Sequence, residues 1–359
     1  MRVGIVCPYS LTLAGGVQAQ VLDLACALQR RGIQARVLAP CDGPPPHPSV
    51  TPLGNSIPVA DNGSVAPIAP DPAAALRTIR ALRDEQFDVV HLHEPLTPGP
   101  SLTALISAST PLVGTFHRSG PNSWVRALPG LARWCVDHLA VRAAVSQDAL
   151  QTATEAFGGR YELLWNGVDA ARYQGGEEVP KSREPTVLFI GRHEPRKGLS
   201  VLLDALDLLG DDVRLWVASS GPETAKLKRR RSDDHRIEWL GHISETEKVR
   251  RLRAAHVFCA PSLHGESFGV VLLEALAAST AVVASDIPGY RRVVRHEVEG
   301  RLVEPGDPGG LAKAIQEAVG DGPRGGLIDR GLERAHHFSM ERLADRYVQL
   351  YESAAGRPV

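Results

Sequence analysis

Several features that narrow the range of functions are missing from this sequence. Lysine and arginine number 40 against 41 aspartates and glutamates, so the chain lacks the strongly basic composition of a nucleic-acid-binding protein. The five cysteines contain no Cys-x-x-Cys pair, and several stand in apolar runs, which is typical of reduced, buried thiols. No segment approaches the roughly 18 apolar residues of a membrane-spanning helix, and the apolar run that Pro8 ends is too short for a signal peptide. We therefore expect a cytoplasmic protein that binds no nucleic acid.

Two common ligand-binding motifs are also missing. The chain contains neither an Asp-x-Asp sequence nor a Gly-x-x-x-x-Gly-Lys-Ser/Thr phosphate loop. His91 and His93 form a His-x-His pair, but no third metal ligand stands at a convincing spacing. Paired histidines are more often structural, so we expect no bound metal.

The length and the hydrophobic pattern indicate two domains of one architecture. The 359 residues exceed the roughly 250 that one hydrophobic core usually supports. Apolar, strand-like runs alternate with helical periodicity, which indicates βαβ units and parallel sheets. The polar stretch 166–185 is rich in turn-forming residues and divides the pattern. We expect an α/β fold with two Rossmann-like, doubly wound domains facing a cleft: a first domain at 1–168, a linker at 169–185, a second domain at 186–338, and a C-terminal helix at 339–359 that packs back on the first domain.

The ends of the expected strands are the places to search for a site, because parallel sheets bind ligands beyond the carboxyl ends of their strands. The expected strands are 3–7, 33–39, 89–92, 112–116, 139–145, 162–165, 186–190, 213–218, 237–240, 257–260, 281–285 and 300–303. The first helix is expected between the first two strands, since apolar residues from Val17 to Leu28 recur on one face and Gly32 follows.

Gly15 and Gly16 end the loop after the first expected strand and open the first helix. Glycine lets a backbone approach a ligand closely, and a helix N-terminus favours an anion. On spacing alone, this pair is either a phosphate-binding turn or an ordinary flexible turn.

Arg192 and Lys197 stand in the segment 191–198 (GRHEPRKG), directly after an expected strand. Cations on a strand-end loop suit a diphosphate, since arginine binds phosphate as a fork and lysine as a point charge. The alternative is a solvated basic loop. The position at a strand end, before a glycine and a new helix, favours the diphosphate.

Glu266 and Glu274 form the sharpest pattern, in the segment 264–274 (HGESFGVVLLE). We expect a helix whose first turn is 268–271, with Glu266 before it and Glu274 inside it. Carboxylates suit sugar and ribose hydroxyls, and the free N–H groups of Phe268, Gly269 and Val270 favour a phosphate. The alternative makes Glu266 a helix-terminal acid and Glu274 a surface residue, which the apolar neighbours of Glu274 disfavour.

Weaker signals come from polar residues near other expected strands. His117 closely follows the strand at 112–116 and precedes a Gly/Ser loop, the location of a cleft residue. The segment Asn62-Gly63-Ser64 follows a loop and is compatible with a plain turn. An expected helix carries Arg77, Arg80 and Arg83 along one side and apolar residues on the other. Such a helix most often lies at the solvated surface, and the alternative is a helix that binds anionic lipid.

Together these segments resemble the retaining GT-B glycosyltransferases of family four. The resemblance spans nearly the whole chain and rests on the paired glutamates Glu266 and Glu274, the loop GRHEPRKG and the N-terminal GGV. Within the family, the most similar enzymes transfer mannose from GDP-mannose to a phosphatidylinositol lipid, with retention and without a metal. The segments that carry this closer likeness are CPYS, NGSVA, HLHEP, TFH, NGVD and CAP.

The resemblance makes 1–168 the acceptor domain and 186–338 the nucleotide-sugar domain, and it implies a role for each matching position. The donor-binding positions are Gly15, Gly16, Arg192, Lys197, Glu245, Lys248, Glu266, Phe268, Gly269, Val270 and Glu274. Among them Glu266 holds sugar hydroxyls, Glu274 holds the ribose, and Glu245 and Lys248 lie near the base. The catalytic positions are His117, Glu266, Arg192 and Lys197, and the acceptor-binding positions are Tyr9, Asn62 and Ser64.

The resemblance therefore implies a mannosyltransferase that uses GDP-mannose, carries no prosthetic group or metal, and meets anionic phospholipid on the cytoplasmic face of the plasma membrane. Pro67 stands where these enzymes have an arginine, which leaves the acceptor open, and Ser219 and Ser279 stand where the family often has glycine. The alternative is a family-four enzyme that uses a UDP-sugar and a soluble or polysaccharide acceptor. A non-catalytic nucleotide-sugar-binding protein, and an epimerase or phosphorylase of the same fold, are further alternatives.

Overall fold

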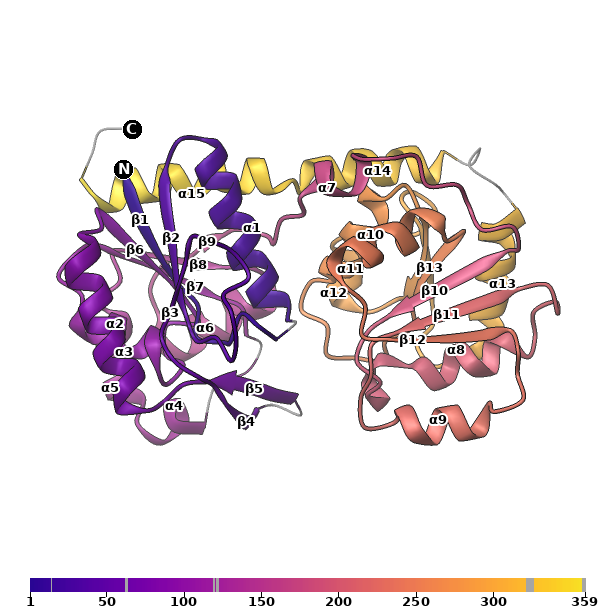
Figure 1. Cartoon of the computed structure of the whole chain (residues 1–359), viewed down its shortest axis with the longest axis horizontal. Coiled ribbons are helices and arrows are strands. Elements are labelled where there is room, and N and C mark those ends of the chain that lie inside the picture. Colours follow the sequence, from indigo (N-terminus) through magenta and orange to yellow (C-terminus); the bar gives the residue numbers. More distant parts are fainter. Residues whose placement is uncertain (14, 62–63, 119, 121–122, 321–325, 357–359) are drawn as a thin grey trace. The chain divides into compact units, whose positions relative to one another are not determined.

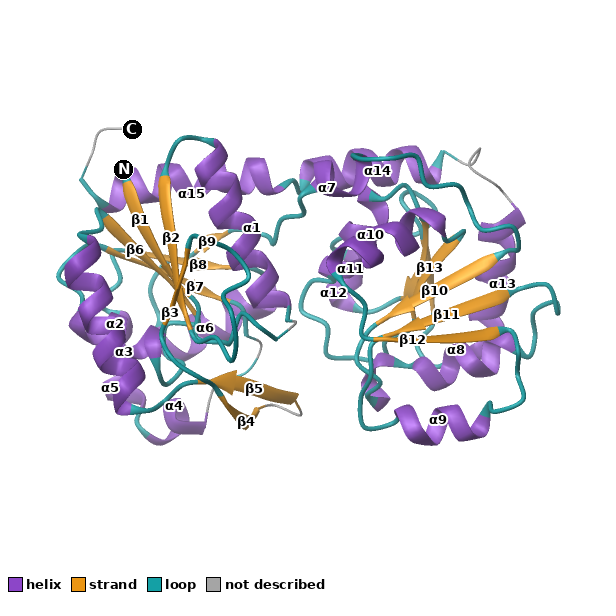
Figure 2. Ribbon diagram, in the orientation of Figure 1, coloured by secondary structure: helices purple, strands orange, loops and turns teal. Residues whose placement is uncertain are grey.

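The chain divides into two compact units, shown in Figures 1 and 2. The computed structural model describes residues 1–359 apart from positions 14, 62–63, 119, 121–122, 321–325 and 357–359. The first unit contains Met1–Gly167 and the segment that begins at Met340, and the second contains Val168–Ser339. The residues expected as a linker, 169–185, thus lie in the second unit.

The first unit is built on a seven-stranded parallel sheet in the order β3-β2-β1-β6-β7-β8-β9. Its strands are β1 (Arg2–Val6), β2 (Gln34–Ala39), β3 (Val50–Pro52), β6 (Val89–His93), β7 (Leu112–Phe116), β8 (Val141–Ala144) and β9 (Glu162–Leu163). A separate antiparallel hairpin joins β4 (Ile57–Asp61) to β5 (Ser64–Ile68). The strand order reverses between β1 and β6, and ligands bind beyond the carboxyl ends of strands at such a reversal.

Helices cover both faces of this sheet. They are α1 (Gly16–Arg30), α2 (Pro72–Glu85), α3 (Pro100–Ser107), α4 (Ser123–Ala127), α5 (Pro129–Val136), α6 (Gln147–Phe157) and α15 (Met340–Ala354). On one face, α1 and α15 lie side by side and bury Leu24 and Tyr347 against Ile5 of β1 (Figure 1). On the other face, α3, α5 and α6 pack against β6 and its neighbours, for example through Phe157 and Leu92. The expected segment 339–359 thus contains a helix that packs within the first unit.

The second unit repeats this architecture with a six-stranded parallel sheet in the order β12-β11-β10-β13-β14-β15. Its strands are β10 (Thr186–Ile190), β11 (Arg214–Ala218), β12 (Ile237–Gly241), β13 (Val257–Ala260), β14 (Ala281–Ser285) and β15 (Arg301–Val303). Its helices are α7 (Ala170–Gln174), the 3-10 helix η1 (Pro195–Lys197), α8 (Leu199–Leu206), α9 (Thr224–Arg230), α10 (Glu245–Ala254), α11 (Val270–Ala277), α12 (Pro288–Arg291), α13 (Pro308–Gly320) and α14 (Leu327–His337). The order reverses between β10 and β13, so the loops after these two strands are the natural place for a ligand.

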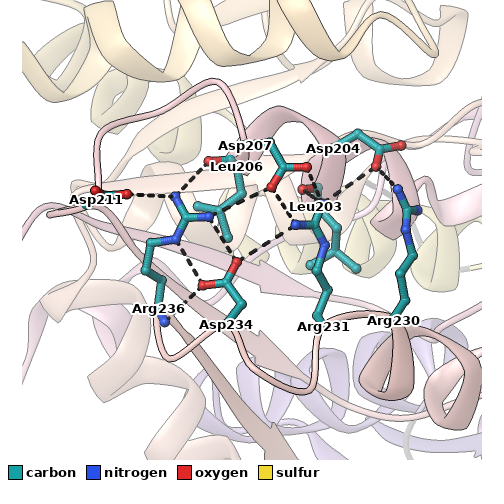
Figure 3. Close-up of polar contacts among 9 residues, drawn as sticks. All are labelled: Leu203, Asp204, Leu206, Asp207, Asp211, Arg230, Arg231, Asp234 and Arg236. Carbon is teal, nitrogen blue, oxygen red and sulfur yellow. Dashed lines mark hydrogen bonds and ion pairs between the residues drawn. The ribbon is translucent and has the colours of Figure 1, made fainter.

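A network of ion pairs fixes α9 and β12 to the end of α8 (Figure 3). Arg231 donates to the carbonyl oxygen of Leu203, and Arg236 donates to that of Leu206 at 3.0 Å. These last-turn carbonyls lack partners inside the helix, and a guanidinium charge suits the C-terminal end of the helix dipole. Asp207 also pairs with both arginines. The network thus holds the outer part of the sheet to its covering helix.

Each strand expected from the sequence is present, with ends within two residues of the expected ones. Strand β3 and the hairpin β4–β5 were not expected. Pro58 and Pro67 disfavour strands, but in the structure they lie opposite each other in a two-stranded hairpin, where a proline interrupts no central ladder. The expected start of a helix at 268–271 is wrong: α11 begins at Val270, because Gly269 has φ 90° and cannot belong to the helix.

Candidate active site

The carboxylate of Glu266 is held by two cations in the second unit. Lys197 Nζ lies 2.6 Å from Glu266 Oε1, and Arg196 Nη1 donates to the same oxygen at 3.1 Å. Ser262 Oγ also donates to this oxygen at 3.3 Å. Because the serine proton is used in that bond, the hydroxyl of Tyr290, 2.9 Å away, donates to Ser262 Oγ. Burial raises the pKa of Tyr290, and the charge of Glu266 adds to that effect. Glu266 is therefore a fixed acceptor in the loop that follows β13.

Two features of the loop after β10 place its cations close to Glu266. Glu194, which is buried, accepts from Arg196 Nε at 3.0 Å and pairs with Arg192 Nε at 3.1 Å. Gly198 has φ 67°, and a Cβ there would lie 1.9 Å from the carbonyl oxygen of Pro261. Only glycine allows this close approach between the loops that follow β10 and β13. The two strand ends thus present cations and a carboxylate together.

The N-terminus of α11 follows Glu266 closely in the sequence. Gly269 is the N-cap of the helix, and Val270 is its first residue. Phe268 is buried against Phe338, with ring centroids 5.5 Å apart, so its side chain supports the turn rather than facing a ligand. The first N–H groups of a helix have no intrahelical partner and favour an anion.

A second carboxylate cluster lies within α10 and α11. Lys248 Nζ lies 2.9 Å from Glu274 Oε1 and 2.8 Å from Glu245 Oε2. Lys248 and Glu274 are largely buried, whereas Glu245 is exposed at the start of α10. Burial acts to lower the pKa of Lys248, but the charges of Glu274, Tyr173 and Glu245 together outweigh it, and the pKa is raised. Tyr173 of α7 is buried beside this pair, and burial together with Glu274 raises its pKa.

In the first unit, the predicted residues gather around the ends of β1 and β7. Gly15 is the N-cap of α1 and Gly16 is its first residue. Tyr9 follows β1 and forms an antiparallel bridge with Ile68 of the hairpin whose second strand begins at Ser64. Asn62, the remaining predicted acceptor residue, lies outside the described residues.

His117 directly follows β7 and contacts a neighbouring histidine. Its Nε2 lies 2.8 Å from Nδ1 of His93, and its backbone N–H donates to Glu94 Oε1 at 2.7 Å. Burial lowers the pKa of His117 to about 3, so the ring is neutral near pH 7. His91 instead bonds to Thr115 at 2.7 Å and to Tyr351 of α15 at 2.8 Å. His91 is thus structural, whereas His93 supports His117.

The described part of the chain contains neither a metal-binding cluster nor a membrane-spanning helix. There, no group of three or more histidine, cysteine, aspartate or glutamate side chains is arranged to hold a metal ion. Within the same residues, no helix combines the length and apolar character needed to cross a bilayer.

The comparisons with known proteins identify the family. The model described as Glycosyltransferase Family 4 matches residues 14–172, and the model described as Glycosyl transferases group 1 matches residues 184–321. A Mycobacterium leprae protein named phosphatidyl-myo-inositol mannosyltransferase is 40% identical to this chain and covers 99% of it, while the chain covers 97% of that protein. The chain belongs to the family-four glycosyltransferases. A Mycolicibacterium smegmatis protein of the same name is 38% identical, with 99% and 95% covered.

Solved structures agree on the GT-B fold of this glycosyltransferase. Anabaena HepE, solved in complex with UDP and glucose, has a TM-score of 0.74 at 19% identity and covers 98% of this chain, and 100% of HepE is covered. Sucrose-phosphate synthase from Thermosynechococcus elongatus has the same TM-score at 20% identity, with 98% of both chains covered. The prediction of two doubly wound α/β domains is confirmed, as is membership of family four.

Several residues of the glycosyltransferase site were not singled out from the sequence. They are Arg196, Glu194, Ser262 and Tyr290, whereas His93 was considered only as half of a His-x-His pair and not as a partner of His117. Arg196 and Glu194 belong to the conspicuous GRHEPRKG loop, so the loop was found but its internal pairing was not. Ser262 and Tyr290 carry no motif signal, because their contact depends on packing between the β13 loop and α12.

Proposed function

We propose that this glycosyltransferase moves mannose from GDP-mannose to the inositol ring of a phosphatidylinositol lipid, with retention of configuration. The observation that carries the proposal is the 40% identity to a relative named phosphatidyl-myo-inositol mannosyltransferase, over 99% of this chain. The cation–carboxylate arrangement at the ends of β10 and β13 supports donor binding.

The donor is held by the second unit in this proposal. Lys197 and Arg192 bind the diphosphate, since cations pair strongly with phosphate oxygens. Glu266 accepts from sugar hydroxyls and Glu274 from ribose hydroxyls, because ionised carboxylates are acceptors only. The backbone N–H groups at the start of α11 add to the diphosphate site. Glu245 and Lys248 lie near the base.

The chemistry needs stabilisation of the departing diphosphate more than a nucleophile from the protein. The bond from the anomeric carbon of mannose to the phosphate oxygen breaks, and a bond to the inositol oxygen forms on the same face. The hydroxyl proton passes to the departing phosphate oxygen. Lys197, Arg192 and the N-terminus of α11 stabilise the negative charge that develops there. No residue of the chain is required to form a covalent bond to the sugar.

A surface of the first unit supports contact with an anionic membrane from the cytoplasmic side. On α2, Arg80 and Leu76 have side chains that are largely exposed. On the neighbouring elements of the same unit, Ile106 of α3 and Leu131 and Trp134 of α5 are also exposed. Apolar side chains and arginines on one helical surface suit the boundary between lipid headgroups and acyl chains. We call these residues, together with Ile79 and Arg83 of α2, the α2–α5 surface.

The acceptor is the part of the proposal that most needs a test. Pro67 lies in β5, opposite Pro58, at the position where the similar enzymes have an arginine. Without that cation, a soluble acceptor with a UDP-sugar donor is the second candidate. Tyr9 and Ser64 remain the proposed acceptor residues of the described chain.

The deciding experiment measures transfer from radiolabelled GDP-mannose to phosphatidylinositol vesicles, with UDP-glucose and UDP-N-acetylglucosamine as parallel donors. Labelled lipid from GDP-mannose alone is expected, and Glu266→Gln should abolish it. Label transferred only from a UDP-sugar, or only to soluble glycans, would overturn the proposal in favour of the second candidate.

A further inference from the structure

His93 and His117 meet through their rings at the carboxyl end of the first unit's sheet. His93 is the last residue of β6, and His117 follows the neighbouring strand β7. Their Nδ1 and Nε2 atoms are 2.8 Å apart, so one ring donates a hydrogen bond to the other. Glu94 fixes the backbone of His117 by accepting from its N–H at 2.7 Å. His117 is thus held by its Nε2, and its Nδ1 has no partner among the described residues.

The surroundings of His93 decide which ring donates. Burial lowers the pKa of His117 to about 3 and that of His93 well below its ordinary value, so both rings are neutral near pH 7 and each carries one proton. If His93 accepted, its proton would sit on Nε2, which is buried and has no hydrogen-bond partner in the described structure. Folded proteins rarely bury an N–H without an acceptor. His93 therefore donates from Nδ1, and His117 accepts at Nε2.

We propose that His93 is a positioning residue that fixes His117 as the Nδ1–H tautomer, so that His117 meets the substrate as a hydrogen-bond donor and not as a general base. The inference rests on the proposed function, because it assigns the role of His117 in that reaction. With Nε2 occupied by His93 and a proton on Nδ1, His117 has no free lone pair to accept the proton of the acceptor hydroxyl. In the proposed reaction that proton goes to the departing phosphate, and His117 supplies only a hydrogen bond to the substrate.

The test reads the tautomer directly and separately from activity. The full chain is labelled with ¹⁵N-histidine, and the His117 signals are assigned by their loss in His117→Gln. Wild type should show His117 as the Nδ1–H tautomer. His93→Asn places an amide nitrogen near the position of Nδ1 and keeps a donor, whereas His93→Leu removes it. The Asn variant should keep the tautomer and a kcat within about threefold of wild type, and the Leu variant should lose the tautomer and about tenfold in kcat, as for one lost hydrogen bond.

Two results would overturn the inference: an Nε2–H tautomer of His117 in the wild type, or an unchanged tautomer and kcat in His93→Leu. If the Leu variant does not fold, the wild-type spectrum and the Asn variant still decide the question. Donor affinity, followed by calorimetry with GDP, should change little in either His93 variant, because the diphosphate residues lie in the second unit. Failure of GDP-mannose as a donor would overturn the proposed function but would not alter the tautomer result.

Discussion

Lys197 and Glu266 form an ion pair, with Nζ 2.6 Å from Oε1, although they belong to loops that follow different strands of one sheet. The pair places the cation that suits a diphosphate beside the carboxylate that suits a sugar. A nucleotide sugar carries these two groups next to each other, so one ligand can satisfy both residues.

Replacement of Lys197 by methionine should weaken GDP binding about 10- to 100-fold, because one charge-assisted hydrogen bond contributes about 1.5–3 kcal/mol. Isothermal titration calorimetry measures this affinity. Lys226→Met is the matched control, since Lys226 is three-quarters exposed and lies on α9. Equal affinities of the two variants would exclude Lys197 from the diphosphate site.

Glu266→Gln should leave GDP affinity within about threefold and reduce transfer by at least about 100-fold, as for other lost transition-state contacts. A radiochemical transfer assay measures the rate, and mass spectrometry of the variant checks for a sugar attached to the chain. A trapped glycosyl-enzyme would contradict the same-face route, because that route forms no covalent intermediate.

Loss of Glu274 should destabilise the second unit as well as weaken donor binding. Glu274→Gln leaves the buried charge of Lys248 without its main partner, which typically costs about 3–5 kcal/mol. Thermal unfolding measures the loss, and the double variant Glu274→Leu/Lys248→Met should regain most of it. Wild type should bind GDP more tightly than 2′,3′-dideoxy-GDP, and both Glu274 variants should lose this preference. A preference that persists would remove Glu274 from the ribose site.

The α2–α5 surface should govern binding to anionic vesicles. Replacement of Arg80 and Arg83 by serine should lower the affinity about 30-fold at low salt, since each arginine near such a surface contributes about 1 kcal/mol. Leu131→Ser/Trp134→Ser should lower it at every salt concentration, because burial of apolar area does not depend on ionic screening. Vesicle sedimentation measures both effects. Leu208→Ser, an exposed leucine of the second unit, is the control and should change nothing.

Acid should destabilise the first unit through its buried histidines. Burial lowers the pKa of His91 to about 3, while an unfolded histidine titrates near about 6.5. The stability contribution is therefore complete above about pH 6.5 and is lost as the pH falls towards the folded value, by at most about 1.4 kcal/mol per pH unit for each such group. Calorimetric melts between pH 4.5 and 8 measure the slope. His91→Gln should reduce it, and the exposed His138 is the control position for the same change.

A single serine-to-glycine change should stabilise the second unit. Ser279 follows the C-cap of α11 and has φ 54°, a conformation that costs a non-glycine residue about 1–2 kcal/mol. Ser279→Gly removes that cost, but glycine also raises the conformational entropy of the unfolded chain, which offsets part of the gain. We expect the free energy of unfolding to rise by about 0.5–1 kcal/mol. Chemical denaturation measures it. Ala278→Gly, one residue earlier at φ −80°, should lower stability instead.

The sequence predicted the central strands because each is an apolar run bounded by turn-forming residues, as at 186–190. Ser219 and Ser279 stand where the resemblance implies glycine. Both have positive φ, at 82° and 54°, a conformation that glycine adopts without strain. The hairpin β4–β5 was not predicted, because Pro58 and Pro67 are unfavourable in strands and Asn-Gly, although a strong hairpin signal, is also compatible with a plain turn.

For the candidate site, the sequence indicates individual residues but not the contacts between them. Strand-end positions located Lys197, Glu266 and His117 because topology alone dictates which end of a parallel sheet binds ligands. The pairing of His93 with His117 depends on the register that sets His93 opposite Thr115, and that register is decided by packing across the whole sheet. The local sequence therefore does not indicate this register.

The helix α15 belongs to the first unit but follows the second unit in the sequence, so it is translated late. Ile5 and His91 leave the ribosome early, but the residues that cover them, Tyr347 and Tyr351, are translated only after the whole second unit. The nascent first unit therefore keeps the apolar residues that α15 covers exposed until the whole second unit has been translated. The half of the enzyme that is begun first is thus completed last, because its core includes residues of α15 that are translated after the second unit.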